Sequence, residues 1–235
     1  MPHRRQVALA LALTGAALVA ATGHAQPAFE ERVLGDPHAP VEIRQYSSLS
    51  CPACAVYHEE IMPFLKETYV GTGRARIVYR DVVTNAPSLM ASTLAHCAGE
   101  RFFEFLDVLY DNQRSWATAP SPAAAREQLR ESGLPDAFAR AGGSAEEVEF
   151  LYEIAGPINR LLAIGQLGGL GKDEMFACFT DFELQSRIVE DPRPEFERYD
   201  VTGTPTIVVD GEKVGRGVPT RAAMASAVDA ALAGR

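Results

Sequence analysis

The chain has 235 residues, of which 47% are hydrophobic and 23% are charged, and its formal net charge is −9. This composition is that of an ordinary globular protein, long enough for one large domain or for a domain that carries an insertion, and it excludes a disordered chain. An acidic balance without a basic run also argues against nucleic acid and anionic membrane surfaces as partners.

The first 25 residues have the pattern of a signal peptide. Arg4 and Arg5 form a basic start, residues 7–21 are almost entirely Ala, Leu and Val, and small residues occupy positions 23 and 25. The apolar run has about 15 residues, against the roughly 20 that a membrane anchor needs. We therefore expect cleavage after Ala25 and export to the periplasm, by the Sec route rather than by the twin-arginine route.

A β-α-β arrangement follows the signal peptide. Residues 41–46 alternate in the manner of a strand, and residues 75–83 are rich in the β-branched side chains that strands favour. Between them, the spacing predicts a helix from Cys51 to about Tyr69. The apolar face of this helix is expected to consist of Val56, Tyr57, Ile61, Phe64 and Leu65.

A block without strand signals extends from about residue 86 to residue 179. Ser121 and Pro122 predict a helix cap followed by proline at the first helical position, and Ser144 with Glu147 predicts a capping box. Pro157 and several glycines separate the helical segments. The block is therefore expected to be entirely helical.

The last part of the chain returns to a mixed pattern. Asp181 can cap a helix, residues 206–215 predict two strands joined by an Asp-Gly turn, and a final helix is expected from about Thr220 to Gly234. The two ends of the mature chain, residues 26–85 and 181–235, then form one α/β domain. Residues 86–180 form an inserted helical domain.

The motif Cys51-Pro52-Ala53-Cys54 carries the clearest chemical signal. Redox centres, zinc sites and structural bridges all use two cysteines at this spacing. Cys51 follows a strand and opens a helix, where free backbone N–H groups and the helix dipole stabilise a thiolate. We expect Cys51 to be the attacking sulfur and Cys54 to resolve its mixed disulfides. Zinc or copper binding is the alternative, but no second pair of ligands stands at metal spacing.

The residues around this motif resemble those of the DsbA-like family of thiol:disulfide oxidoreductases, over nearly the whole mature chain. The resemblance rests on the tract 46–54, on the helical block, and on the tract 201–206 with its Gly-Thr-Pro. It implies a thioredoxin-like α/β fold with an inserted all-helical domain. It also implies a cis Pro205 facing the cysteines, with the Thr204 backbone open to an extended client segment. The alternative for Pro205 is a proline that merely starts a strand.

Three positions depart from the pattern of the family. Ala53 replaces the usual histidine, and Gln45 and His58 stand where acidic residues often occur. These changes leave the oxidising strength open. His58 follows Cys54 by one helical turn and could relay its proton, whereas the alternative is a helix-surface histidine without a mechanistic role.

Cys97 and Cys178 lie in the helical block. In an exported protein two further cysteines favour a disulfide, and some relatives of the resembled family carry a second, non-catalytic one. We predict a Cys97–Cys178 disulfide, which closes a loop of about 80 residues and contributes roughly 4 kcal/mol in the chain-entropy model. Two buried free thiols are the alternative.

The combined interpretation is a periplasmic enzyme that introduces disulfides into exported proteins, with the Cys51–Cys54 disulfide as its redox group and no other cofactor or metal. Its expected partners are reduced client proteins and, by resemblance only, a membrane quinone-linked reoxidase. A monomer is expected. The alternatives are a disulfide isomerase or reductase, because Thr before the proline also occurs in isomerases of this fold, and a non-catalytic module that binds metal or peptide.

Overall fold

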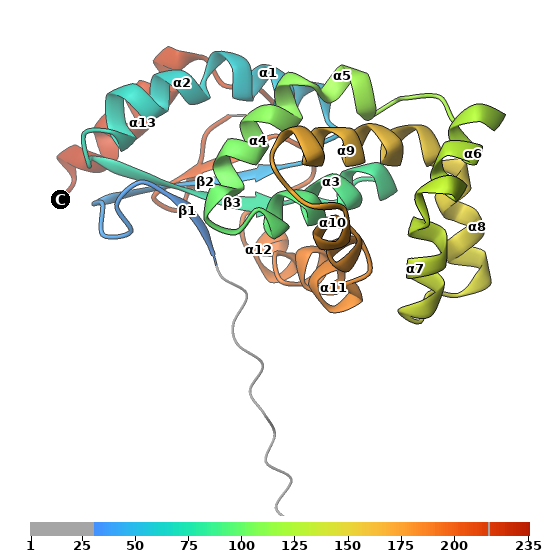
Figure 1. Cartoon of the computed structure of the whole chain (residues 1–235). Coiled ribbons are helices and arrows are strands. Elements are labelled where there is room, and N and C mark those ends of the chain that lie inside the picture. Colours follow the sequence, from blue (N-terminus) through green and yellow to red (C-terminus); the bar gives the residue numbers. More distant parts are fainter. Residues whose placement is uncertain (1–30, 216) are drawn as a thin grey trace, which may run out of the picture.

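In the part of the chain that the structure describes, five strands form a single mixed sheet in the order β1-β3-β2-β4-β5 (Figure 1). The computed structural model describes residues 31–215 and 217–235, so the predicted signal peptide lies outside the described residues. The strands are β1 (Arg32–Leu34), β2 (Val41–Ser47), β3 (Ala75–Asp81), β4 (Thr206–Val209) and β5 (Glu212–Lys213). β2 and β3 pair in parallel, and the other neighbouring strands pair antiparallel.

Helices from both ends of the described chain cover the two faces of the sheet. They are α1 (Pro52–Glu60), α2 (Met62–Leu65), α11 (Phe182–Glu190), α12 (Arg193–Arg198) and α13 (Arg221–Ala233). In Figure 1, α1, α2 and α13 lie above the sheet and α11 and α12 lie below it. Tyr57, Ile61 and Leu65 share one buried apolar core with strand residues such as Ile43 and Ile77. Burial of these apolar side chains fixes α1 against the strand that precedes it.

The helical block begins after β3 and builds a second, larger core. Its helices are α3 (Ala86–Cys97), α4 (Phe102–Asp111), α5 (Gln113–Trp116), α6 (Ala123–Ser132), α7 (Leu134–Arg140), α8 (Ala145–Glu153), α9 (Ala155–Leu167) and α10 (Lys172–Phe179). A 3₁₀ turn, Gly99–Arg101, joins α3 to α4. Phe102, Phe105 and Leu109 of α4 are buried in this core, and Trp116 is wholly buried beside them. The chain thus has the predicted thioredoxin-like fold with a helical insertion, while its division into domains at the stated residue limits stays a prediction.

Several predicted local signals are present. Ser144 and Glu147 form the capping box of α8, and Asp181 caps α11 through its side chain. The last helix, α13, begins after Thr220, where the sequence predicts its start. Asp210 and Gly211 form the turn between β4 and β5. In the part of the chain that the structure describes, no helix combines the length and the apolar character needed to cross a bilayer.

Other local expectations need correction. The helical segment after Cys51 extends to Val70, close to its predicted end, but it is interrupted between α1 and α2, where Pro63 lacks the N–H that would continue the helical ladder, and it ends in a π-helical stretch, Lys66–Val70. Val56 is 39% exposed and so lies off the buried face of α1. Strand β1 was not expected, since it has only three residues and depends on pairing with β3.

Ser121 is also not the helix cap that its sequence predicts. Pro122 occupies the cap position of α6, which begins at Ala123. The Ser121 hydroxyl instead accepts a hydrogen bond of 3.0 Å from the Gly156 N–H of α9. The side chain therefore ties the loop before α6 to another helix.

Candidate active site

Cys51 occupies the junction between β2 and α1, and Cys54 lies one turn into the helix. Cys51 is extended at the cap position, with φ −81° and ψ 121°, and Pro52 follows in the first turn where its missing N–H is tolerated. The Cys51 carbonyl accepts hydrogen bonds from the N–H groups of Cys54 and Ala55 at 3.0 and 3.2 Å. Both cysteines are free thiols, Cys51 half-buried and Cys54 buried. A partner thiol can thus reach only the first sulfur directly.

The environment separates the acidities of the two thiols. A hydrogen bond from the Cys54 thiol is the largest cause that lowers the pKa of Cys51 to about 5, although burial opposes it, and the backbone N–H groups of Ala53 and Cys54 add to the effect. Burial raises the pKa of Cys54 far above its ordinary value. At neutral pH the reduced pair is therefore a thiolate at Cys51 beside a thiol at Cys54.

The loop before β4 brings Thr204 and Pro205 to Cys51. The Thr204–Pro205 peptide bond is cis, as the resemblance implies, and Pro205 is buried. The antiparallel pairing of Tyr46 with Thr206 sets this loop beside the end of β2. Cys51 Sγ lies 3.4 Å from the Thr204 carbonyl oxygen, to which its thiol form donates. The structure therefore brings together residues that stand about 150 positions apart.

Gln113 of α5 supports the active-site loop from the helical block. The side chain is 5% exposed, and its Nε2 donates hydrogen bonds of 2.7 Å to the Leu49 carbonyl and 2.9 Å to the Cys51 carbonyl. The sequence does not reveal Gln113 as a site residue, because no local pattern in α5 shows which loop its side chain contacts. Trp116, whose position the sequence left open, belongs to the core and donates from Nε1 to the Leu109 carbonyl.

His58 lies in a buried polar contact between α1 and α4. Its side chain is only 7% exposed, so the alternative of a surface histidine is wrong. Nε2 lies 2.7 Å from Asp107 Oδ1, and the ring stacks on Tyr110 with centroids 4.6 Å apart. Lys66 donates to both Asp107 oxygens at 2.8 Å. Burial raises the pKa of Asp107, but the hydrogen bonds from His58 and Lys66 outweigh it and hold that pKa below its ordinary value.

Neutral polar side chains are buried on β2 and around Cys54. Gln45 is buried and donates to Ser47 Oγ at 3.0 Å. The hydroxyls of Tyr79 and Tyr110 lie 3.3 Å apart. Burial, reinforced by the proximity of Cys54, raises the pKa of Tyr57 and Tyr110. These neutral groups do not compensate for the desolvation of a Cys54 thiolate, in accord with the raised pKa of that thiol.

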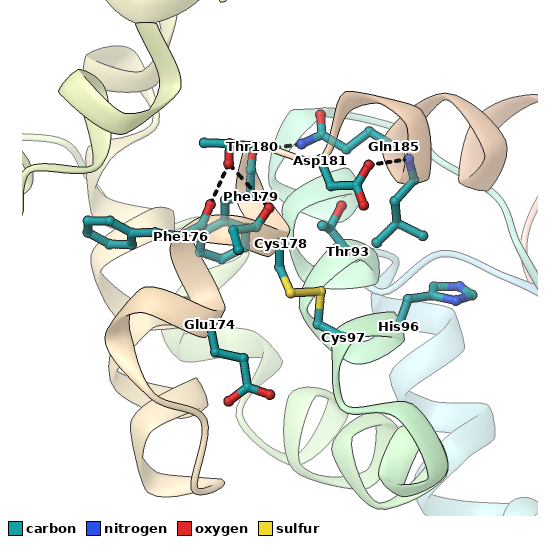
Figure 2. Close-up of a disulfide and its surroundings, with 12 residues drawn as sticks. Thr93, His96, Cys97, Glu174, Phe176, Cys178, Phe179, Thr180, Asp181 and Gln185 are labelled. Atoms are coloured by element: carbon teal, nitrogen blue, oxygen red, sulfur yellow. Dashed lines mark hydrogen bonds between the residues drawn. A yellow bond between two sulfur atoms is a disulfide. The ribbon is translucent and has the colours of Figure 1, made fainter. Parts of the chain in front are cut away.

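Cys97 and Cys178 form a disulfide in the structure (Figure 2). It joins the end of α3 to α10, with a Cα–Cα distance of 6.2 Å, and both residues are half-buried. The pairing is the one that the sequence analysis predicts. Because Cys97 and Cys178 are bonded to each other, Cys51 and Cys54 are the free thiols of the described chain.

Metal ligation was the alternative use of the cysteines. Within residues 31–215 and 217–235, no three His, Cys, Asp or Glu side chains gather closely enough to hold a metal ion.

Comparison with known proteins places these features in a wider context. The thioredoxin family model matches residues 28–230. A Rickettsia bellii protein named as a protein-disulfide oxidoreductase is 26% identical over 183 residues, which make up 77% of this chain and 57% of that relative. The chain therefore spans a little over half the length of this curated relative.

Solved structures show the same fold. The alpha-DsbA1 structure of Wolbachia pipientis has a TM-score of 0.66 and 21% identity, and the match covers 88% of this chain and 94% of that one. Oxidised BdbD from Bacillus subtilis has a TM-score of 0.57 and 16% identity, with 86% and 93% covered. At these identities the likeness establishes the arrangement of the elements, helical insertion included.

Proposed function

Because the chain belongs to the thioredoxin family over residues 28–230, we propose that it is a thiol:disulfide oxidoreductase that introduces disulfides into exported proteins through Cys51 and Cys54. The name of the Rickettsia bellii relative supports this class of reaction. The observation that carries the proposal is the pair of unequal sulfurs beside the cis Pro205. One is accessible with a pKa near 5, and the other is buried with a raised pKa.

The reaction starts from the oxidised Cys51–Cys54 pair. A client thiolate attacks Cys51 Sγ, a client–Cys51 disulfide forms, and Cys54 leaves as a thiolate that takes up a proton. A second client thiolate then attacks the client sulfur of that mixed disulfide. Cys51 leaves as a thiolate, so the client gains one disulfide and the enzyme holds two reduced sulfurs. The low pKa makes Cys51 the better leaving group in this last step.

The same low pKa sets the direction of electron flow. A thiolate that is stable at pH 7 favours the reduced enzyme over its disulfide, and this makes the disulfide oxidising. A pKa near 5 raises the reduction potential by up to about 60 mV at pH 7 relative to an ordinary thiol, before solvent screening reduces the effect. We therefore favour oxidase activity over isomerase or reductase activity.

The proposed place of action is the periplasm. The signal-peptide pattern predicted for residues 1–25 supports export, and disulfides persist in an oxidising compartment. The partners are reduced exported proteins, which present an extended segment to the Thr204 backbone. A membrane quinone-linked partner would return the enzyme to its disulfide form, since each turnover leaves Cys51 and Cys54 reduced. The redox group is the Cys51–Cys54 disulfide itself, and the proposal includes no other cofactor.

The reduction potential of the Cys51–Cys54 pair tests the proposal. It is measured by equilibration with glutathione buffers, alongside the rate at which the oxidised protein forms disulfides in a reduced, unfolded substrate. We expect a potential near or above about −150 mV and the loss of oxidation in Cys51→Ala. A potential near about −270 mV would instead indicate a reductase. Failure to form a mixed disulfide with reduced substrates would exclude the oxidoreductase assignment altogether.

A further inference from the structure

A groove extends from the active-site loop along α5. Its first section, with a volume of about 620 Å³, is lined by Ser50 and Pro52 on either side of Cys51, by Val56 of α1 and by Gln113 of α5. A second section of about 450 Å³ lies between α5, the loop after it and α9. Arg114 and Thr118 line both sections, so the two adjoin each other at these residues. We call the two sections together the α5 groove.

The far section of the α5 groove is positively charged. Its charged lining residues are Arg114 and Arg160, and no carboxylate lines it. Both arginines are exposed, and neither has a hydrogen bond or ion pair with another residue of the described ranges. By contrast, arginines on the sheet such as Arg44 and Arg80 are paired with Glu195. In a chain with a net charge of −9, two unpaired guanidinium groups in one groove form a local site for anions.

The section near Cys51 differs in character. Glu59 and Asp111 line it together with Arg114, and Val56 and Ala117 supply apolar surface. Thr204 and Pro205 do not line either section. The α5 groove is thus a surface separate from the backbone of Thr204, and it offers a second path for a chain that leaves Cys51.

We infer that the α5 groove binds an extended segment of the client whose cysteine reacts at Cys51, and that Arg114 and Arg160 select segments with acidic side chains. This inference rests on the proposed function. The observations that favour this occupant are the continuity of the groove with the loop that holds Cys51 and the charge of its far section. Arg114 directly follows Gln113, which hydrogen-bonds the Cys51 carbonyl, and it lines the same section as Ser50 and Pro52. An extended chain advances about 3.3 Å per residue, so an acidic side chain a few residues from the client cysteine can reach Arg114. Glu59 and Asp111 disfavour acidic groups directly beside the cysteine.

Peptide oxidation provides the test. Two peptides carry the same cysteine pair, flanked at a distance of several residues by Asp in one and by the isosteric, neutral Asn in the other. The oxidation rate of each peptide is measured with the disulfide form of the whole protein and, separately, with oxidised glutathione. The first rate is divided by the second, because neighbouring carboxylates change the pKa, and so the intrinsic reactivity, of a peptide thiol. We expect the Asp peptide to react about threefold to tenfold faster on this scale, since exposed ion pairs are individually weak and act mainly on association. High salt should remove the advantage.

Variants assign the effect to the two arginines. Arg114→Gln with Arg160→Gln should bring the ratio of Asp to Asn peptide rates close to one. Arg140→Gln with Arg198→Gln is the matched control, because both arginines are exposed, on α7 and α12, lie outside both sections of the groove, and their replacement removes two positive charges, as in the double variant. That variant should keep the ratio of the wild-type protein.

The outcomes separate this inference from the proposed function. If the wild-type protein does not oxidise even the Asn peptide, the oxidoreductase proposal fails. If it oxidises both peptides at equal corrected rates, or if the double arginine variant keeps the preference, the inference about the α5 groove is overturned while the proposed function stands. Dimers of the wild-type protein that dissociate in the double variant would show that a second copy occupies the groove, which also overturns the inference.

Discussion

At the scale of single residues, the acidity of Cys51 depends most on Cys54. The Cys54 thiol donates the hydrogen bond that contributes most to the low pKa of Cys51. In Cys54→Ala we therefore expect that pKa to rise from about 5 by at least about one unit. The measurement is the pH dependence of the rate at which iodoacetamide alkylates Cys51 in the reduced proteins. An unchanged midpoint would show that the backbone N–H groups of Ala53 and Cys54 suffice.

His58 gives a second prediction at this scale. It belongs to the turn after Cys54, its Nδ1 is buried and has no hydrogen-bond partner in the described chain, and Asp107 holds its Nε2. If His58 relays the proton of Cys54, His58→Ala should slow thiol exchange roughly tenfold and flatten its pH dependence between about pH 6 and 8.

The control for His58 is Asp107→Asn, which keeps the shape of the Asp107 side chain but removes the carboxylate that orients the ring. It should show an intermediate rate and pH profile. Unchanged exchange rates in His58→Ala across this pH range would leave the histidine a purely structural role in the contact between α1 and α4.

At the scale of secondary-structure elements, α5 holds the active-site loop through one side chain. Gln113→Ala removes the donor from the Leu49 and Cys51 carbonyls, and buried carbonyls that lose a partner cost about 1–3 kcal/mol. We expect the free energy of unfolding, measured with urea, to fall by this amount in Gln113→Ala. The matched control is Gln128→Ala, since Gln128 is exposed on α6 and its loss should change stability by less than about 0.5 kcal/mol. Equal effects of the two variants would contradict the role assigned to α5.

The elements that the sequence predicts well are those whose signals are local. The turn at Asp210-Gly211 and the caps at Ser144 and Asp181 depend on neighbours within a few positions, and the structure contains all of them. Ser121 shows the limit of this reasoning, because a hydroxyl that can cap a helix can equally accept a hydrogen bond from another one. Strand β1 likewise exists only through its partner β3.

The residues of the candidate site also fall into two groups, those with a local signal in the sequence and those without one. The chemistry of Cys51 and Cys54 follows from their type and spacing at a strand–helix junction, and Pro205 follows from a motif. Gln113, Asp107 and Lys66 reach the site only because α4 and α5 pack against α1. No periodicity within one element encodes such a contact between elements, so the sequence alone could not reveal these residues.

At the scale of the whole molecule, the Cys97–Cys178 disulfide connects the start and the end of the helical block. The two residues are separated by 81 positions, and closing a loop of this length stabilises the folded protein by about 4 kcal/mol in the chain-entropy model. We expect Cys97→Ala with Cys178→Ala to lose about 2–4 kcal/mol of unfolding free energy in urea. The wild-type protein with only Cys51 and Cys54 reduced is the control. A loss below about 1 kcal/mol would show that helix packing alone fixes this block.

The free energy of unfolding of the whole protein depends on the redox state of Cys51 and Cys54, and this dependence changes with pH. In the reduced, folded protein the pKa of Cys51 is about 5, below the ordinary value of 9.0. The thiolate therefore stabilises the folded reduced form above the folded pKa, and this contribution disappears as the pH falls through about 5. The oxidised form has no such thiol, and Cys54 stays protonated in the folded protein because burial raises its pKa.

The reduced protein should accordingly gain stability over the oxidised protein as the pH rises from about 5 to about 7.5, by about 2 kcal/mol after allowance for the partial exposure of Cys51. Urea unfolding of both redox forms at several pH values in this window measures the gain. Reduced Cys51→Ser is the control, because a serine hydroxyl does not ionise in this range and its pH profile should run parallel to that of the oxidised wild-type protein. Parallel profiles for the two wild-type forms would mean that the folded protein does not lower the pKa of Cys51, which would remove the basis for an oxidising disulfide.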